Sequence, residues 1–355
     1  MRASLSFPYI KPLDGLRGFA VIIVMVHHAI RRHITGGFFG VDIFFVLSGF
    51  LITSLLAREY QKSTTIDFKA FYKRRILRLI PALLLLISII IIPMMIRGNS
   101  TAVESVLKES LITLLYCSNW VRAFHLFPLN ILDHTWSLSI EEQFYILWPL
   151  SFFLIAKFAK TNKKIIISIS SLILLFTILR WFIAYKFFDS YHLYNAFYTR
   201  TDGLLLGCLL GHLMSLESFE KKMKAQAKLI NYLSCISFLG LFILFFTMEW
   251  QSPAVYYYGF SLVNIFSILI ILDLTISSKE KKIFNFPALV WAGKISYGLY
   301  LWHYPVYCIL ANLEYKSWEI LAIGGPITFI FAALSYQCLE FPILKGSSRN
   351  RVGNF

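Results

Sequence analysis

Four long runs without a charged residue constrain the fold of this chain more than any other feature. These runs are residues 79–96, 229–248, 250–272 and 320–339. A helix rises about 1.5 Å per residue, so each run is long enough to cross the ~30 Å hydrocarbon core of a bilayer. Only 15% of the 355 residues are charged and 57% are hydrophobic, which excludes an ordinary soluble domain. The sequence therefore predicts a polytopic membrane protein of the all-α class.

The hydrophobic pattern predicts about ten membrane-spanning helices in one domain. The predicted spans lie near residues 13–31, 38–57, 79–97, 136–156, 164–184, 201–216, 229–248, 254–273, 287–312 and 319–343. The first span is expected to be a true span and not a cleavable signal. Most of the 34 lysines and arginines fall on the side that holds the N-terminus, which predicts two cytoplasmic termini. We expect a membrane domain over residues 11–343 and a short basic cytoplasmic tail over residues 344–355.

The net charge of +15 is explained by this topology and by contact with anionic lipid. The bilayer is therefore an expected partner, whereas nucleic acid is not. The five cysteines are scattered without the spacing of a metal site or a disulfide framework, so no metal is expected.

Arg17 and His28 bring ionisable groups into the first predicted span. They are eleven residues apart, and eleven steps along a helix return to within ~20° of the starting direction, so the two side chains share a face. Asp14 lies about one turn before Arg17 and can pair with it, while His27 points ~100° away from His28. Ionisable groups inside a membrane are costly and usually mark function. The alternative is that both side chains extend to the membrane interfaces.

Three predicted spans are too short to keep their leading charges out of the membrane. Their uncharged stretches are residues 43–57, 143–156 and 203–216. As helices these stretches measure only ~21–23 Å. We expect Asp42, Glu142 and Asp202, which precede them, to lie in the outer half of the membrane near His28. A thinned bilayer or shallow helices would be the alternative.

A basic cluster is expected at the inner end of the third span. Arg75 and Arg78 are three residues apart and share a helix face, next to Arg74. Arginine suits bidentate recognition of phosphate, although positive-inside anchoring alone would also place it there. In the ninth span, Tyr300 and His303 share a polar face. His303 either lines a pocket or hydrogen-bonds to a neighbouring helix.

Seven motifs, taken in order, resemble the signatures of the acyltransferase-3 family of integral membrane acyltransferases. They are Arg17-x10-His28, GVDIFFVLSGF at 40–50, RRILR at 74–78, WSLSIEEQFY at 136–145, RTDG at 200–203, ISYGLYLWHYP at 295–305 and LEFP at 339–342. Each motif alone is weak, but the ordered set is specific and covers nearly the whole chain.

The resemblance implies an O-acyltransferase of the bacterial inner membrane. Its donor would be a cytoplasmic acyl-CoA, most often acetyl-CoA. Its acceptor would be a sugar hydroxyl in a surface glycan such as O-antigen, lipopolysaccharide or exopolysaccharide, or in a lipid-linked sugar. Some family members carry a further soluble extracytoplasmic domain, which we expect this chain to lack.

Roles for individual residues follow from the residue chemistry and the resemblance together. His28 is the expected general base, because the ordinary pKa of histidine lies near neutral pH. Asp42 or Glu142 would orient it, as the third member of a triad does, and Arg17 would hold the donor or Asp14. The expected donor-binding residues are Arg74, Arg75, Arg78, Asp14 and Lys294. The expected acceptor-pocket residues are Arg200, Asp202, Tyr300, His303 and Glu340. Direct transfer and an acyl-histidine intermediate are both open.

The rival hypothesis is a proton-coupled transporter of a glycan or lipid. Acids and a histidine inside the membrane fit a proton relay as well as they fit catalysis. Against a transporter, the sequence has no paired interrupted helices of the kind that transporter repeats supply.

Overall fold

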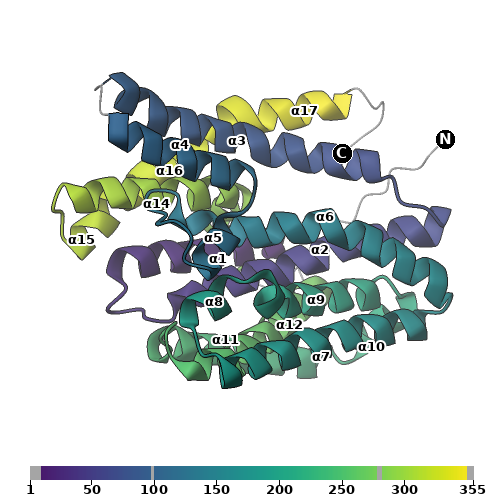
Figure 1. The fold of residues 1–355 in the computed structure, drawn as a ribbon. Helices are drawn as coiled ribbons and strands as arrows, with labels where there is room; N and C mark the ends of the chain where they lie inside the picture. Colours follow the sequence, from purple (N-terminus) through teal and green to yellow (C-terminus); the bar gives the residue numbers. More distant parts are fainter. Residues whose placement is uncertain (1–8, 97–99, 278–281, 350–355) are drawn as a thin grey trace.

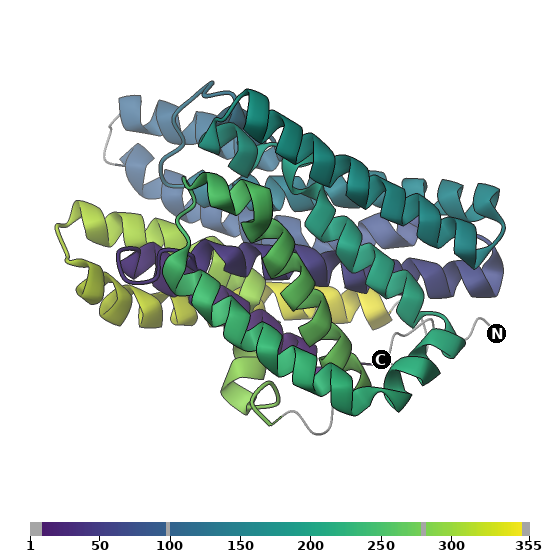
Figure 2. The same ribbon diagram turned by 90° about the horizontal axis from the view of Figure 1, so that it is seen from below.

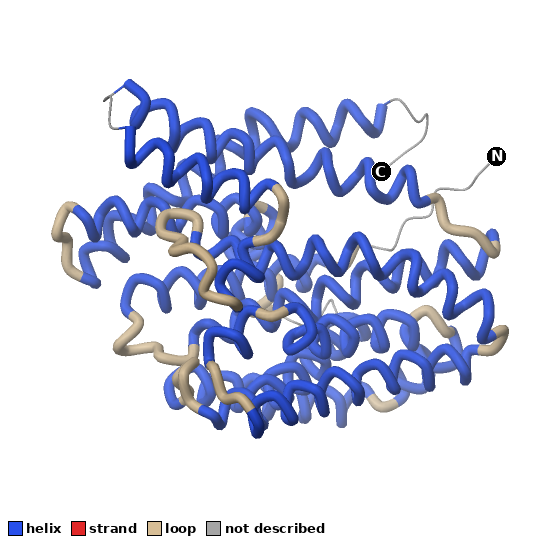
Figure 3. The backbone as a smooth tube through the Cα atoms, viewed as in Figure 1, coloured by secondary structure: helices blue, strands red, loops and turns tan. Residues whose placement is uncertain are grey.

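The computed structural model describes residues 9–96, 100–277 and 282–349, and this part of the chain is built from helices joined by short loops without any strand (Figure 3). The longer helices are α1 Lys11–Ile30, α2 Gly40–Ser63, α3 Phe68–Ile96, α4 Ser100–Leu114, α6 Trp136–Ala159, α7 Asn162–Lys186, α9 Phe197–Met214, α11 Ala227–Thr247, α12 Phe260–Ile276, α14 Ser296–Asn312 and α16 Gly325–Ser335. The shorter helices are α5 Ser118–Ala123, α8 Ser190–Asn195, α10 Glu217–Ala225, α13 Pro287–Lys294, α15 Ser317–Glu319 and α17 Phe341–Arg349. The prediction of an all-α membrane protein is confirmed.

Seven helical segments in the described part are long and apolar enough to cross a membrane, and each coincides with a predicted span. They are Lys11–Ile30, Gly37–Ser63, Phe68–Ile96, Asn162–Lys186, Ala227–Thr247, Val255–Ile276 and Ser317–Lys345. The other three predicted spans fall on α6, on α9 and on the pair α13 and α14. These helices carry charges or are short, so a count of ten spans and the cytoplasmic termini stay predictions.

The helices form a bundle with α2 near its centre. Figures 1 and 2 show α3 and α4 on one side, α7, α11 and α12 on the other, and α1 and α2 between them. In its most apolar stretch 78% of the α2 segment is buried, against 17% for α7. The residues around α2 are therefore shielded from lipid, which makes this region the place where charged side chains can be accommodated.

Glycine lets α9 approach α2 closely. Gly203, Gly207 and Gly211 recur every fourth residue and form one stripe along α9. A Cβ atom at Gly207 would run into the Val46 carbonyl, and one at Gly49 would run into the Leu204 carbonyl. Small residues at this spacing are common where two membrane helices pack, because they let the backbones come into direct van der Waals contact.

Two helices differ from the predicted spans in ways that matter for the site. The helix α3 begins at Phe68, eleven residues before the predicted span. Arg75 therefore lies seven residues, or ~10 Å, inside the helix. The predicted ninth span is broken between α13 and α14, where Ile295 leaves the helical conformation. Residues 97–99, at the end of the predicted third span, lie outside the described residues.

Candidate active site: an arginine-lined cavity and a histidine pair

A cavity of about 90 Å³ lies between α1, α2, α3, α6 and α14. Its polar and charged lining residues are Arg17, Ser48, Arg75, Arg78, Tyr116, Ser137, Glu141, Glu142, Tyr145, Ser296, Tyr297 and Tyr300. Its apolar lining residues are Val41, Phe44, Phe45, Leu47, Leu51, Leu79 and Leu138. Segments that are far apart in the sequence therefore contribute to one polar site inside the bundle.

The cavity gathers three guanidinium groups. Arg17 comes from α1, and Arg75 and Arg78 come from α3. The Arg75 guanidinium carbon lies 4.2 Å from the centre of the Tyr145 ring, a cation–π contact that orients it. The Nε atom of Arg17 is buried and makes no hydrogen bond within the described residues. Three positive groups, one of them with unused hydrogen-bonding capacity, suit an anionic ligand.

The expected pair between Arg17 and Asp14 is absent from the described residues. Asp14 instead accepts a hydrogen bond of 2.8 Å from the Tyr9 hydroxyl. Arg17 faces the cavity, one turn further along α1.

Of the other expected donor residues, Arg74 is exposed and does not line the cavity. Lys294 is also exposed, with its Nζ atom 5.8 Å from the centre of the Tyr9 ring.

Two carboxylic acids share this cavity, which corrects the prediction of separate basic and acidic sites. Glu141 accepts a 2.5 Å hydrogen bond from the Ser48 hydroxyl, and Glu142 also lines the cavity. Helix packing is the physical reason, because Arg75 and Arg78 lie within α3 and not at its end, and they line the same cavity as these acids. Neither acid hydrogen-bonds to His28 in the described structure, so the expected orienting role of Glu142 is not supported by the geometry.

Tyr300 and Ser137 lie side by side in the lining of the cavity. Their hydroxyl groups are 2.6 Å apart, and the Tyr300 hydroxyl also donates to the His134 carbonyl at 2.9 Å. The Tyr300 ring then contacts His303, with 5.3 Å between the ring centres. Tyr300 thus stands between the cavity and a group of histidines.

His28 and His303 form a direct hydrogen bond. The Nδ1 atom of His28 lies 2.8 Å from the Nε2 atom of His303. His27 points elsewhere, with its Nδ1 atom 2.7 Å from the Ile34 carbonyl oxygen. The prediction that the two neighbouring histidines face different sides is therefore confirmed. His303 is buried, whereas His28 is partly exposed, so the outer ring of the pair is the one that a second substrate can approach.

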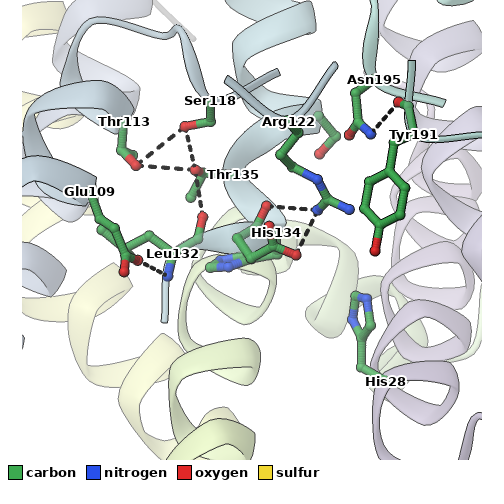
Figure 4. Close-up of polar contacts among 12 residues, drawn as sticks. His28, Glu109, Thr113, Ser118, Arg122, Leu132, His134, Thr135, Tyr191 and Asn195 are labelled. Carbon is green, nitrogen blue, oxygen red and sulfur yellow. Dashed lines mark hydrogen bonds and ion pairs between the residues drawn. The ribbon is translucent and has the colours of Figure 1, made fainter. Parts of the chain in front are cut away.

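His134 joins this group from the turn before α6. Its ring centre lies 5.4 Å from that of His303, and neither of its ring nitrogens makes a well-formed hydrogen bond in the described part of the chain. The Thr135 hydroxyl is 2.9 Å from that of Ser118 and 3.1 Å from that of Thr113, and this hydroxyl cluster anchors the turn (Figure 4).

An ion pair between Arg122 and Asp133 also fixes this turn. The Arg122 guanidinium donates to the Asp133 carboxylate at 2.7 Å and to the Asp133 carbonyl at 3.1 Å. Burial raises the pKa of Asp133 to about 6, and the nearby Arg122 opposes this shift. In Figure 4 the His28 ring lies below Arg122 and Tyr191. The ion pair therefore holds the turn that carries His134 next to the ring of His303.

Asp42 and Asp202 belong to buried ion pairs and not to the histidine group. Asp42 binds Arg200 at 2.7 Å, and Asp202 binds Arg180 at 2.6 Å. The Arg200 guanidinium carbon also lies 3.8 Å from the centre of the Phe260 ring. Asp42 therefore makes no hydrogen bond to His28, which corrects its expected orienting role. The pairs connect α2 with α9 and α7 with α9, so the geometry places Arg200 and Asp202 in the helix framework and not in an acceptor pocket.

Glu340 also lies apart from the histidines. It accepts a 3.1 Å hydrogen bond from the Ser335 hydroxyl and ends a π-helical turn, Tyr336–Glu340, that packs against α3. Among the five expected acceptor-pocket residues, His303 hydrogen-bonds to His28, and Tyr300 contacts the ring of His303.

Sequence reasoning missed three residues that shape this region. Ser48 and His134 lie within or next to the motifs, but nothing in their spacing indicates a contact with Glu141 or with His303. Arg180 had a visible signal, because it is a lone charge inside the apolar run of residues 165–185. A charge in that position indicates a buried partner, which the structure identifies as Asp202.

Comparisons with known proteins identify the family. A family model described as an acyltransferase domain, of the acyltransferase-3 type, matches residues 10–337. The O-acetyltransferase OatA of Staphylococcus aureus is 37% identical over 95% of this chain and 57% of its own length. The peptidoglycan O-acetyltransferase OatA of Listeria monocytogenes is 34% identical over 99% of this chain and 58% of its own length.

The chain thus spans less than three fifths of the length of these relatives. No solved structure matches it significantly. The match of the family model to nearly the whole chain, together with the ordered motifs, shows that the chain belongs to the acyltransferase-3 family of integral membrane acyltransferases.

Proposed function

We propose that this domain transfers an acetyl group from a cytoplasmic acyl-CoA to a sugar hydroxyl of a cell-surface glycan, with peptidoglycan as the first candidate. The observation that carries the proposal is the arginine-lined cavity that ends at Tyr300, next to the pair of His28 and His303. The two relatives are named as O-acetyltransferases, and one is named for peptidoglycan. We further propose that the membrane is the bacterial plasma membrane.

The cavity suits a short acyl thioester. Coenzyme A supplies phosphates and an activated acyl group, and Arg75 and Arg78 are placed to bind anionic groups through charged hydrogen bonds. A cavity of ~150 Å³ is known to hold benzene. A volume of about 90 Å³ therefore favours an acetyl group over a long acyl chain.

His28 is the proposed base. It takes the proton of the acceptor hydroxyl as the oxygen attacks the thioester carbon. The carbon–sulfur bond then breaks, and the leaving thiolate receives the proton, so that the products are an ester and a free thiol. Because Tyr300 stands between the cavity and His28, the transfer requires this side chain to turn away.

Release of free thiol tests this function directly. Purified protein in lipid, given acetyl-CoA and peptidoglycan fragments, should release coenzyme A only when an acceptor is present. Fragments of O-antigen or of an exopolysaccharide serve as parallel acceptors and decide the glycan class. A proton-coupled transporter would release no thiol with any of them, and that result would reject the proposal.

Replacing Arg75 or Arg78 with alanine should weaken acetyl-CoA binding. Loss of a charged hydrogen bond costs ~1.5–3 kcal/mol, or roughly ten- to a hundredfold in Kd. Lysine should restore only part of the affinity, since it cannot form the bidentate fork. Arg74→Ala is the matched control, because Arg74 lies on the same helix but is exposed outside the cavity. The Kd values are measured by calorimetry. If all three alanine variants had the same Kd, Arg75 and Arg78 would serve only to anchor the topology.

A further inference from the structure

We propose that His303 is a positioning residue that fixes the ring tautomer of His28 and leaves the Nε2 atom of His28 as the free base. The proposal rests on the function proposed above and deepens it. It assigns to a neutral histidine the task that a carboxylate performs in a hydrolase triad.

The first step of the argument is the contact between His303 and the backbone. The Nδ1 atom of His303 lies 3.1 Å from the Leu299 carbonyl oxygen, one turn earlier on α14. A carbonyl oxygen can only accept a hydrogen bond, so the hydrogen must be on Nδ1 of His303. His303 is fully buried, so water does not compete for this contact.

The second step follows from the chemistry of a neutral imidazole, which carries one hydrogen and one lone pair. With its hydrogen on Nδ1, His303 presents a lone pair at Nε2. The Nδ1 atom of His28, 2.8 Å away, must then be the donor. The reverse arrangement would turn the Nδ1 lone pair of His303 toward the lone pairs of the Leu299 carbonyl.

The surroundings of the two rings favour this neutral state. Their close aromatic neighbours are His27, Tyr304, His134, Tyr300 and Tyr307. Within the described residues, no carboxylate hydrogen-bonds to either ring. Both imidazoles therefore lack a counterion that would favour the charged form.

The consequence is a free lone pair on the accessible ring. The Nδ1 atom of His28 is hydrogen-bonded to His303, and its Nε2 atom makes no hydrogen bond in the described part of the chain. When Nε2 takes the hydroxyl proton, the Nδ1 hydrogen can move to Nε2 of His303. The positive charge is then shared by two rings, and the Leu299 carbonyl stabilises it through the existing hydrogen bond. The pair thus supplies the stabilisation that a buried carboxylate would otherwise give.

Two amide substitutions separate the two contacts of His303. The asparagine amide reaches the position of Nδ1 and keeps the bond to Leu299, but it leaves His28 without a partner. The glutamine amide reaches the position of Nε2 and offers an oxygen to the Nδ1 hydrogen of His28. We expect His303→Asn to lower kcat of acetyl transfer by ~10²–10⁴, with KM for acetyl-CoA nearly unchanged. We expect His303→Gln to lower kcat less, because the glutamine oxygen still fixes the tautomer of His28 but cannot take the proton.

Equal kcat values for the two variants would overturn the role of His303, provided that the wild type transfers acetyl. Absence of thiol release by the wild type would overturn the proposed function and this role with it. Nitrogen-15 solid-state NMR of the wild type, labelled at histidine and compared with His28→Ala, tests the tautomer without relying on either amide variant. The His28 signal should be that of an unprotonated Nε2 with hydrogen on Nδ1, and the opposite tautomer would reject the proposal.

Discussion

Replacing His28 with alanine should lower the rate of acetyl transfer by ~10²–10⁴, the usual contribution of a general base. Acetyl-CoA binding should be unchanged, because Arg75 and Arg78 line the cavity on the other side of Tyr300. Assays of thiol release measure the rate of transfer, and calorimetry measures the Kd for acetyl-CoA. The expected variant inserts into the membrane, binds the donor and fails to transfer.

His27→Ala is the matched control for this prediction. The two histidines are adjacent in the sequence, but His27 is buried against the Ile34 carbonyl and makes no contact with His303. Its removal should affect stability more than rate. Equal losses of rate in the two variants would contradict the assignment of His28, and full transfer by His28→Ala would move the search for the base to His134 or Glu142.

Asp42→Ala should destabilise the folded protein by ~3–5 kcal/mol, the usual cost of leaving one partner of a buried ion pair without the other. Asp42 and Arg200 are both almost fully buried, and their pair joins α2 to α9. Without Asp42, the Arg200 guanidinium stays enclosed by Phe260 and its other ring neighbours with no counterion. A lower midpoint of thermal unfolding in detergent would measure this effect.

The double variant Asp42→Leu with Arg200→Met tests whether the loss is electrostatic. Removing both charges should recover much of the stability, since a well-packed apolar pair can replace a buried ion pair. Asp202→Ala should be as harmful as Asp42→Ala, because Arg180 is enclosed in the same way. If Asp42→Ala kept wild-type stability but lost transfer, Asp42 would be an orienting residue after all.

These two predictions separate residues that the sequence placed in one group. His28, Asp42 and Glu142 all looked like intramembrane groups at one level of the bilayer. In the structure His28 binds another histidine, Asp42 binds an arginine of the framework, and Glu142 faces the arginine cavity. A charge inside a membrane indicates that a partner exists, but the partner comes from a distant segment.

The sequence alone determined the properties that depend on local chemistry and on regular geometry. Runs of uncharged residues are sufficient to predict a membrane bundle, because the hydrocarbon core admits little else. The helical repeat was sufficient to separate His27 from His28, because adjacent residues of an α-helix point ~100° apart. The ordered motifs were sufficient to identify the family, which the match over residues 10–337 confirms.

Only the tertiary structure decided which charged groups meet. The contact between His28 and His303 spans 275 positions of the chain, and the pair of Asp42 and Arg200 spans 158. Both depend on how the helices pack around α2 and on how far each is shifted along its axis. The packing of α3 had the same kind of effect, because it brought Arg75 and Arg78 into one cavity with Glu141 and Glu142. Helix register within one segment follows from the sequence, whereas the relative depth of two segments is set by side-chain packing and glycine contacts along their whole length.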